Sequence, residues 1–231
     1  MLDPLRLANS YTMKGRLIAI GDIHGCHLEF SEMLDKLKLK SADRLVLLGD
    51  LVNRGPDSAK VIDLAIKTKA IAILGNHEIR LLKYRKSLDK SILRECDYPT
   101  LKQLKPRHWA YLKSMRLTYE VRKLNLIFVH AGFLPGMPWR KQSPEIVTRI
   151  QSINKNGEMI KRSKTKANLS WAAKWRGPRF VVYGHTPRSK IYKLKWSVGI
   201  DTSCVLGGFL TAYVLPKRTF VQVKAKERYY P

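Results

Sequence analysis

Short runs of apolar residues recur along the chain, and each one ends abruptly at a polar residue or a glycine. Runs of this length are typical of strands that are buried on both faces of a parallel sheet. In an α/β fold the residues that follow such strands gather at one edge of the sheet, where ligands bind. The runs occupy residues 16–20, 44–48, 70–74, 124–129 and 179–183.

Segments with a helical spacing of apolar residues lie between several of these strands. Residues 27–38 and 58–67 have this spacing, and they are predicted to be the crossover helices that parallel strands require. The pattern over residues 79–122 is also helical, although Pro99 and Pro106 interrupt it. We interpret residues 79–122 as a helical cap beside the ligand-binding edge, although residues 117–119, like residues 126–129, are expected to join a second sheet. A helical stripe packed into the core is the alternative interpretation.

The last part of the chain alternates between apolar and polar residues. Residues 196–200, 208–215 and 219–223 alternate well enough to form antiparallel strands, which we expect to close a second sheet. Together with the parallel strands they predict an α/β (α+β) fold, in which two mixed β-sheets pack face to face and helices flank them. A chain of 231 residues can bury one substantial core, so we expect a single domain over residues 1–231.

The charge of the chain is unusual, because 44 Lys and Arg stand against 18 Asp and Glu, which gives a formal net charge of +26. Basic residues concentrate in residues 80–116 and 155–195. Such an excess attracts polyanions and speeds association with them. We therefore expect a nucleoside polyphosphate or another polyanionic substrate, and RNA is a further candidate partner. A solvated basic surface without a partner is the alternative.

The composition also limits where the protein works. No apolar run approaches the roughly 20 residues that span a bilayer, so no membrane association is expected. Residues 1–14 lack the long apolar stretch of a secretory signal. The three cysteines lie far apart, which indicates free thiols in a reducing compartment. We expect a cytoplasmic protein, with an organellar location as the alternative, and the sequence leaves the oligomeric state open.

The first two strands deliver metal-binding side chains to the predicted edge. Asp22 and His24 are two residues apart in an extended segment, so both side chains point to one face and can bind one metal. Asp50 follows the second strand, and its carboxylate has two oxygens that two cations can share. Arg54 offers a planar fork of donors that suits phosphate oxygens.

The other three strands are followed by amide and imidazole side chains. Asn76 and His77 come after the third strand, His130 after the fourth and His185 after the fifth. A single histidine at such a place is more often a hydrogen-bonded residue near the core. Five strands that each deliver Asp, Asn or His to the same edge instead predict a metal site.

These motifs carry a family resemblance. Gly-Asp-x-His-Gly, Gly-Asp-x-Val-x-Arg-Gly, Gly-Asn-His-Glu, His-Ala-Gly and Gly-His-Thr-Pro follow one another as in the calcineurin-like metallophosphoesterases, which are related to serine/threonine protein phosphatases. The resemblance covers residues 16–224, nearly the whole chain. Within that superfamily the chain is most similar to the bacterial symmetrical diadenosine tetraphosphatases and their eukaryotic relatives, through stretches such as residues 53–56, 148–150 and 199–208.

The resemblance implies a dinuclear metal site and a reaction. It implies two divalent ions, with Mn favoured and Fe, Zn or Co as alternatives. The reaction would be hydrolysis of phosphoanhydride bonds in nucleoside polyphosphates by direct attack of a metal-bridging hydroxide. The implied ligands are Asp22, His24 and Asp50 for the first metal, and Asp50, Asn76, His130 and His185 for the second.

The resemblance also implies roles for other side chains. His77 would protonate the leaving oxygen, and Arg54, Arg149 and Asn76 would bind the substrate. Protein phosphatases have, at the position of Asn53, an aspartate that orients the acid histidine, and an asparagine cannot stabilise an imidazolium by charge. The tetraphosphatases have a second arginine at the position of Gln151.

Two other function classes remain open on the same fold. The first is a serine/threonine phosphoprotein phosphatase. The second is a basic RNA-associated protein, either a hydrolase of capped RNA or an RNA-binding member of the family. The presence of every implied metal ligand argues against binding as the sole role. Asn53 favours the nucleoside polyphosphates over phosphoproteins, because the tetraphosphatases also lack the aspartate at this position.

Overall fold

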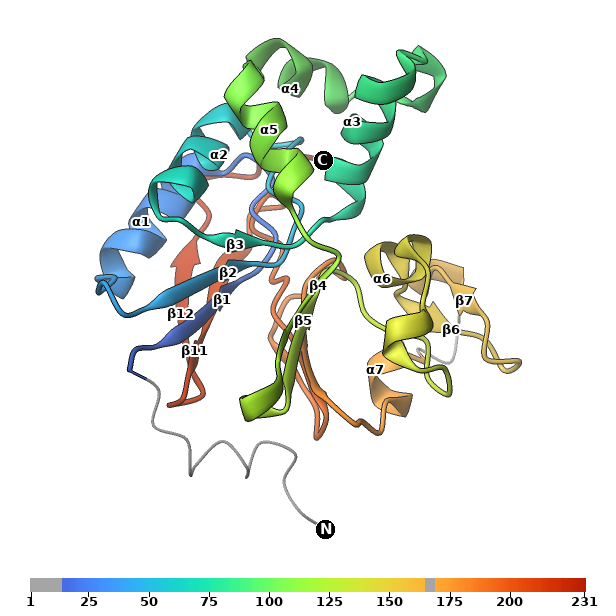
Figure 1. The fold of residues 1–231 in the computed structure, drawn as a ribbon. Helices are drawn as coiled ribbons and strands as arrows, with labels where there is room; N and C mark the ends of the chain where they lie inside the picture. The colour runs from blue at the N-terminus through green and yellow to red at the C-terminus, as the bar shows by residue number, and fades with distance from the viewer. Residues whose placement is uncertain (1–13, 165–168) are drawn as a thin grey trace.

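A computed structural model describes residues 14–164 and 169–231 of the chain. Part of the basic segment 155–195, namely residues 165–168, therefore lies outside the described residues, as does almost all of the N-terminal segment 1–14. The described chain forms two five-stranded sheets and a small two-stranded one (Figure 1).

The first sheet is mixed, because it contains two parallel and two antiparallel pairings. β1 pairs in parallel with β2, and β2 with β3, whereas β11 runs antiparallel to both β1 and β12. The expectation that residues 208–215 and 219–223 close the second sheet was wrong, because β11 pairs with β1 and carries β12 with it into the first sheet. Alternation predicts a strand but does not say which neighbour it pairs with. In spatial order the strands are β12 (Thr219–Lys224), β11 (Phe209–Leu215), β1 (Leu17–Ile20), β2 (Arg44–Leu47) and β3 (Ile71–Ala72).

The second sheet is also mixed. Its central strands β5, β8 and β10 are parallel, and the edge strands β4 and β9 are antiparallel to their neighbours. In spatial order the strands are β4 (Thr118–Val121), β5 (Leu126–Val129), β8 (Phe180–Tyr183), β10 (Ser197–Gly199) and β9 (Tyr192–Lys193). The remaining pair is β6 (Ser152–Ile153) with β7 (Met159–Ile160).

Alternation along β1 explains how the layers pack. Leu17 and Ala19 point into the core between the two sheets, where they join Phe128 and Val182 of the second sheet. The intervening residues of β1 point to the opposite face and pack in the core beneath the helices. The predicted architecture of two mixed sheets packed face to face with helices outside is therefore confirmed. Because both sheets contribute to one core, we propose that they form a single domain.

The helices cover the outer faces and one end of the sheets. Helices α1 and α2 lie on the outer face of the first sheet, and α3, α4 and α5 lie above the end at which β1 and β2 finish (Figure 1). The α-helices are α1 (His27–Leu37), α2 (Ser58–Lys67), α3 (Asn76–Ser87), α4 (Asp97–Gln103), α5 (Pro106–Ser114), α6 (Pro144–Arg149) and α7 (Trp171–Lys174). Short 3-10 turns are η2 (Lys90–Ile92), η3 (Arg122–Leu124), η4 (Trp139–Lys141) and η5 (Arg162–Lys164).

The helical segment is shorter than the predicted cap of residues 79–122. It begins at Asn76 and ends at Ser114, and residues 118–121 form β4, the half-buried edge strand of the second sheet. β4 confirms that the end of this segment joins the second sheet, as expected for residues 117–119. Among the residues that the structure describes, no helix is long and apolar enough to cross a membrane.

Candidate metal centre

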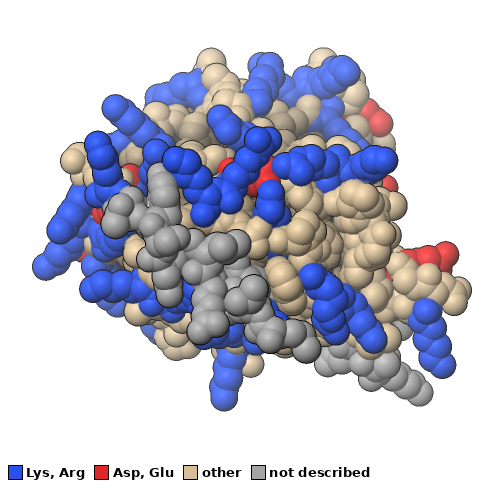
Figure 2. Space-filling view, turned by 60° about the horizontal axis from the view of Figure 1, so that its bottom comes forward, with Lys and Arg blue, Asp and Glu red and all other residues tan. Residues whose placement is uncertain are grey.

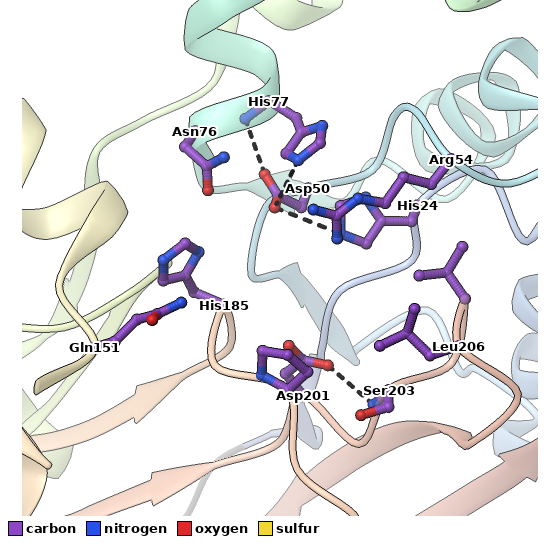
Figure 3. Close-up of a pocket in the computed structure, with 12 residues that line it drawn as sticks. His24, Asp50, Arg54, Asn76, His77, Gln151, His185, Asp201, Ser203 and Leu206 are labelled. Carbon is purple, nitrogen blue, oxygen red and sulfur yellow. Dashed lines mark hydrogen bonds and ion pairs between the residues drawn. The ribbon is translucent and has the colours of Figure 1, made fainter. Parts of the chain in front are cut away.

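Loops from both sheets surround a cavity of about 140 Å³ at the carboxyl ends of the parallel strands. His24 and Asp50 reach it from the first sheet, His185 reaches it from the second, and Asn76 and His77 reach it from the start of α3 (Figure 3). The lining also includes Arg54, Gln151, Pro187, Asp201, Ser203, Val205 and Leu206. The predicted gathering of polar side chains at one edge is thus seen in the geometry.

The loops that carry these side chains are tightly constrained. The amides of Ile23 and His24 donate to the carbonyl oxygen of Asp50 at 3.1 and 2.8 Å, which ties the loop after β1 to the loop after β2. His24, Asp50 and His185 all have positive φ angles, of 47°, 48° and 63°. Non-glycine residues rarely adopt this conformation, and such strain concentrates at functional sites.

Three imidazoles hydrogen-bond backbone carbonyls on the side away from the cavity. Nδ1 of His24 lies 3.0 Å from the carbonyl oxygen of Val52, and Nδ1 of His130 lies 2.8 Å from that of Leu48. Nε2 of His185 lies 3.1 Å from the carbonyl oxygen of Arg149. A carbonyl only accepts, so each of these nitrogens carries the hydrogen and the other ring nitrogen keeps a lone pair.

The other nitrogens of these rings lie close to Asp50 or to one another. Nε2 of His24 and Nε2 of His130 each lie 3.5 Å from Oδ2 of Asp50. His130 Nε2 also lies 3.1 Å from His185 Nδ1 and 3.2 Å from Asn76 Oδ1. Acceptor atoms held this close, with outer hydrogen bonds that orient the rings, fit divalent cations. Asp50 is shared by a group with His24 and a group with His130 and His185, which is the place of a bridging ligand.

The electrostatics of the cluster favour positive charge beside Asp50. Burial opposes ionisation of this carboxylate, but His130 and His77 outweigh it and hold its pKa well below the usual value. Burial likewise disfavours the charged form of His130, yet Asp50 raises the pKa of that imidazole to about 10. Burial lowers the pKa of His24 to about 4 and that of His185 to about 3. A cation bound between these groups would supply the positive charge that a proton on His130 otherwise supplies.

Asp22 lies beside the cluster and faces the loop after β8. Its two carboxylate oxygens accept the backbone amide of His185 at 2.9 and 3.1 Å. Burial, and then the neighbouring Asp201, raise the pKa of Asp22 well above its usual value. Two like charges in a buried space repel, so a cation between them would relieve the repulsion. Asp22 is not among the described residues that line the cavity or form the ligand groups around Asp50, so its role as a ligand of the first metal stays a prediction.

Glu78 has a supporting position that the Gly-Asn-His-Glu motif alone did not explain. Its buried carboxylate accepts the backbone amides of Asp50 at 2.9 Å, Leu51 at 2.8 Å and Gly75 at 2.9 Å. These bonds join the first turn of α3 to the loop after β2. In return the amide of His77 donates to Oδ1 of Asp50 at 3.1 Å, so the helix N-terminus stabilises that carboxylate.

The predicted arginines are placed differently from each other. Arg54 lines the cavity, and its Nη1 lies 3.1 Å from Nε2 of His24. The face of its guanidinium is 5.2 Å from the ring of Tyr230, close to the C-terminal end of the chain. The carbonyl oxygen of Arg149 faces His185. Arg149 is not among the described residues that line the cavity, whereas Gln151, two residues further on, is.

Two residues of the site environment were missed by the sequence analysis. Arg80 donates toward Nδ1 of His77, and Asp97 accepts from both Arg80 and Asn53. Arg80 stands three residues after His77 on the same helix, a spacing that places the two on one face. Asp97 lies 44 residues after Asn53 and carries no local signal of this contact.

Comparison with known proteins agrees with this geometry. Residues 15–209 match the family described as calcineurin-like phosphoesterase. The bis(5'-nucleosyl)-tetraphosphatase PrpE [asymmetrical] of Oceanobacillus iheyensis is 32% identical over 90% of this chain and 92% of that one. The symmetrical bis(5'-nucleosyl)-tetraphosphatase of Wigglesworthia glossinidia brevipalpis is 27% identical over 90% of this chain and 98% of that one. Relatives of both the asymmetrical and the symmetrical kind are therefore similar to this chain.

A solved structure gives the same result. A crystal structure assigned to a diadenosine tetraphosphatase superposes with a TM-score of 0.81 at 32% identity, and the match covers 93% of this chain and 95% of that one. The fold, the ordered motifs and the family match agree, and they confirm the resemblance from the sequence. This chain belongs to the calcineurin-like phosphoesterases and is a metal-dependent hydrolase of phosphoester or pyrophosphate bonds.

Proposed function

We propose that this protein hydrolyses a phosphoanhydride bond of a nucleoside polyphosphate such as diadenosine tetraphosphate, with two divalent cations bound around Asp50. The observation that carries the proposal is the convergence of the lone pairs of His24 and His130 on one carboxylate oxygen, each at 3.5 Å. The names of the relatives direct the proposal from phosphate esters in general to dinucleoside tetraphosphates.

The chain's own side chains have distinct tasks in this proposal. The first cation is assigned to Asp22, His24 and Asp50, and the second to Asp50, Asn76, His130 and His185. Bound cations of this kind acidify water and neutralise the charge of the phosphate oxygens. Manganese is our first expectation, because the site combines carboxylate, amide and imidazole ligands.

The remaining polar groups bind and orient the substrate. The guanidinium of Arg54 lines the cavity, where its fork of donors suits the non-bridging oxygens of the phosphate chain. The amide of Asn76 faces the same space, and Nε2 of His77 lies 4.0 Å from Oδ2 of Asp50, within reach of a leaving oxygen. Arg149 stays a predicted substrate-binding residue, although its side chain would have to turn toward the cavity to act.

The size of the cavity supports a substrate that is recognised by its phosphates. Its volume of about 140 Å³ is well below the roughly 300 Å³ or more of pockets that enclose drug-sized ligands. The phosphate chain fits such a space, whereas the nucleosides would lie on the rim. A long phosphate chain also matches a protein with a net charge of +26.

An activity panel with manganese tests the proposal. Diadenosine tetraphosphate, capped RNA, inorganic polyphosphate and a phosphopeptide are compared by kcat/KM, and the nucleotide products are separated. Two ADP molecules mean cleavage at the centre of the tetraphosphate, whereas ATP with AMP means cleavage off the centre. We expect diadenosine tetraphosphate to be the best of the four. A large preference for the phosphopeptide would reverse the order and make the protein a phosphoprotein phosphatase.

The basic surface favours RNA as a second candidate partner. Figure 2 shows Lys and Arg side chains spread over the face below the sheets, with few acidic side chains between them. A second cavity at this end, where β1 begins, includes Lys14, Arg16, Arg44, Arg122 and Lys123 in its lining. Contacts of this kind bind phosphates without reading bases. This candidate includes capped RNA as a substrate and RNA as a bound partner.

A further inference from the structure

His77 makes its closest side-chain contacts on the side away from the metal ligands. It stands in the first turn of α3, is 2% exposed, and presents Nε2 to the cavity. Its other ring nitrogen, Nδ1, lies 2.8 Å from Nδ2 of Asn53 and 3.0 Å from Nη2 of Arg80. The orientation of this imidazole is therefore determined by the two nitrogen groups that face Nδ1.

Those neighbours determine which ring nitrogen carries the hydrogen. A guanidinium has donors and no acceptor, so Arg80 can only donate to Nδ1. Nδ1 must then present its lone pair, and the hydrogen of the ring stands on Nε2 toward the cavity. This is the reverse of an aspartate partner, which would accept a hydrogen from Nδ1. The neutral imidazole of His77 satisfies these contacts, so the ring neither gains nor loses a proton.

The orientation of the Asn53 amide agrees with this assignment. Its Nδ2 lies 2.6 Å from Oδ1 of Asp97 as well as 2.8 Å from His77 Nδ1, so its two hydrogens have two acceptors. Turning the amide over would place its carbonyl oxygen 2.6 Å from a carboxylate oxygen, which is repulsive. In the described chain the buried Oδ1 of Asn53 has no hydrogen-bond partner, so the amide is oriented by its nitrogen.

Asp97 anchors this network from another helix. It is 0% exposed, and its carboxylate accepts from Arg80 Nε at 2.6 Å, Arg80 Nη2 at 2.9 Å and the backbone amide of Arg94 at 2.7 Å, in addition to Asn53. The two bonds from Arg80 make a forked pair, which is the most directional way to hold a guanidinium. Asp97 thus orients both of the groups that face Nδ1 of His77.

We propose that Arg80 and Asp97 are positioning residues that hold His77 in the tautomer with its hydrogen on Nε2, aimed at the phosphate chain. Arg80 acts directly, and Asp97 acts through Arg80 and Asn53. His77 then serves as a hydrogen-bond donor to an oxygen of the substrate. The effect on catalysis rests on the proposed function, whereas the tautomer itself does not.

The proposal also assigns a task to the helical segment above the site. Asp97 begins α4, and the contact between Asp97 and Asn53 ties that helix to the loop after β2. Ser58 strengthens the same connection, because its hydroxyl lies 3.0 Å from that of Thr100 on α4. Displacement of α4 would therefore release the groups that orient His77, without any change in the metal ligands.

The tautomer is tested by long-range proton–nitrogen NMR on the 15N-labelled protein, both metal-free and loaded with zinc. We expect the wild-type His77 to carry its hydrogen on Nε2 and none on Nδ1. The double variant Arg80→Met/Asp97→Asn removes the Arg80 donor to Nδ1 and the carboxylate that orients the Asn53 donor. It leaves no single buried charge, which would cost roughly 3–5 kcal/mol. In this variant we expect a mixture of tautomers. A hydrogen on Nδ1 of the wild type would overturn the proposal.

A kinetic cycle tests the consequence. With diadenosine tetraphosphate, Arg80→Met/Asp97→Asn should lower kcat roughly 100-fold with little change in KM, because a misplaced group costs about this factor. The conservative single variant Arg80→Lys should lose less of the wild-type kcat than the double variant does. Adding the double change to His77→Asn should lower kcat no further, because the group that it positions is already absent. An equal loss in both backgrounds would show a merely structural role and overturn the proposal.

The matched control is Asp43→Ala, which breaks the ion pair of 2.6 Å between Arg16 and Asp43 beside the start of β1 from the side of the carboxylate. It should lower the melting temperature and leave kcat unchanged, so a stability loss by itself does not imitate the predicted result. If the wild type cleaves no nucleoside polyphosphate, the proposed function fails, and the NMR arm still decides the tautomer.

Discussion

Gly184 precedes the predicted ligand His185, and replacing it with alanine perturbs the metal site through one side chain. A Cβ atom at this position would lie 2.0 Å from Oδ1 of Asp22, and its three nearest atoms all belong to the Asp22 carboxylate. Its φ lies outside the left-handed range, so alanine meets no backbone penalty there. Gly184→Ala therefore tests the placement of Asp22 as a ligand.

The size of the perturbation follows from the distances. Real Cβ atoms essentially never approach another heavy atom below 3.0 Å, so the Asp22 oxygen must move by at least about 1 Å from its place at 2.0 Å. A displacement of about 1 Å at a reacting centre can cost roughly 100-fold in rate. The carboxylate would also lose its bonds to the amide of His185, which costs about 1–2 kcal/mol of stability.

The assay is a manganese titration of diadenosine tetraphosphate hydrolysis, with metal binding measured by calorimetry. We expect Gly184→Ala to need at least 10-fold more manganese for half of its maximal activity, because displaced ligand groups lower metal affinity by roughly 10- to 100-fold. The control is Gly157→Ala, whose Cβ meets nothing within 4 Å in the described chain. At a φ of +81° the control should lose about 1 kcal/mol of stability and no metal affinity.

The two variants together distinguish three outcomes. Weaker metal binding in Gly184→Ala alone supports Asp22 as a ligand. Equal losses in both variants would mean that reduced stability, and not the carboxylate, governs activity. If Gly184→Ala keeps the wild-type manganese requirement and rate, the assignment of Asp22 to the first metal is wrong, since the carboxylate cannot keep its place beside a Cβ atom.

Three further predictions concern other parts of the chain. Asp50→Asn should lower kcat by at least roughly 100-fold and abolish binding of one metal in calorimetry, while the unfolding free energy of the metal-free protein changes little, because the amide has nearly the same shape; normal metal binding would contradict the bridging role. Asn53→Asp would place two carboxylates 2.6 Å apart beside His77 and should destabilise the fold by roughly 3–5 kcal/mol in urea unfolding, whereas an unchanged midpoint would contradict the geometry. RNA affinity should fall steeply with salt, and Lys14→Gln/Arg44→Gln should make the slope of log K against log salt shallower by about 0.7 per lost phosphate contact; a salt-independent affinity would remove the basic surface as an RNA site.

The sequence by itself was sufficient to predict the two-sheet architecture with helices outside and the strand ends that meet at the candidate site. Buried strands appear as apolar runs, and the side chains at their carboxyl ends are displayed toward one edge whatever the rest of the chain does. For this reason His24, Asp50 and His185 were predicted to meet although they are far apart in the chain, and the structure brings them together around one cavity.

Local patterns were less informative at the margins of elements. The predicted cap ran to residue 122 and overlapped residues 117–119, which were also expected in the second sheet; pairing with β5 makes residues 118–121 a strand. A half-buried edge strand has few apolar positions, so its alternation is difficult to separate from the end of a helix. Burial against a neighbouring strand, which is a property of the folded chain, decided this segment.

Only the tertiary structure decided which groups support the ligands. Glu78 holds three backbone amides around Asp50, and Asp97 reaches Asn53 from a helix 44 residues away. Arg149 turns its carbonyl oxygen to His185. Such contacts depend on the packing of segments that are distant in sequence, because a hydrogen bond needs a partner within about 3 Å and the residue type alone does not say which partner will be there.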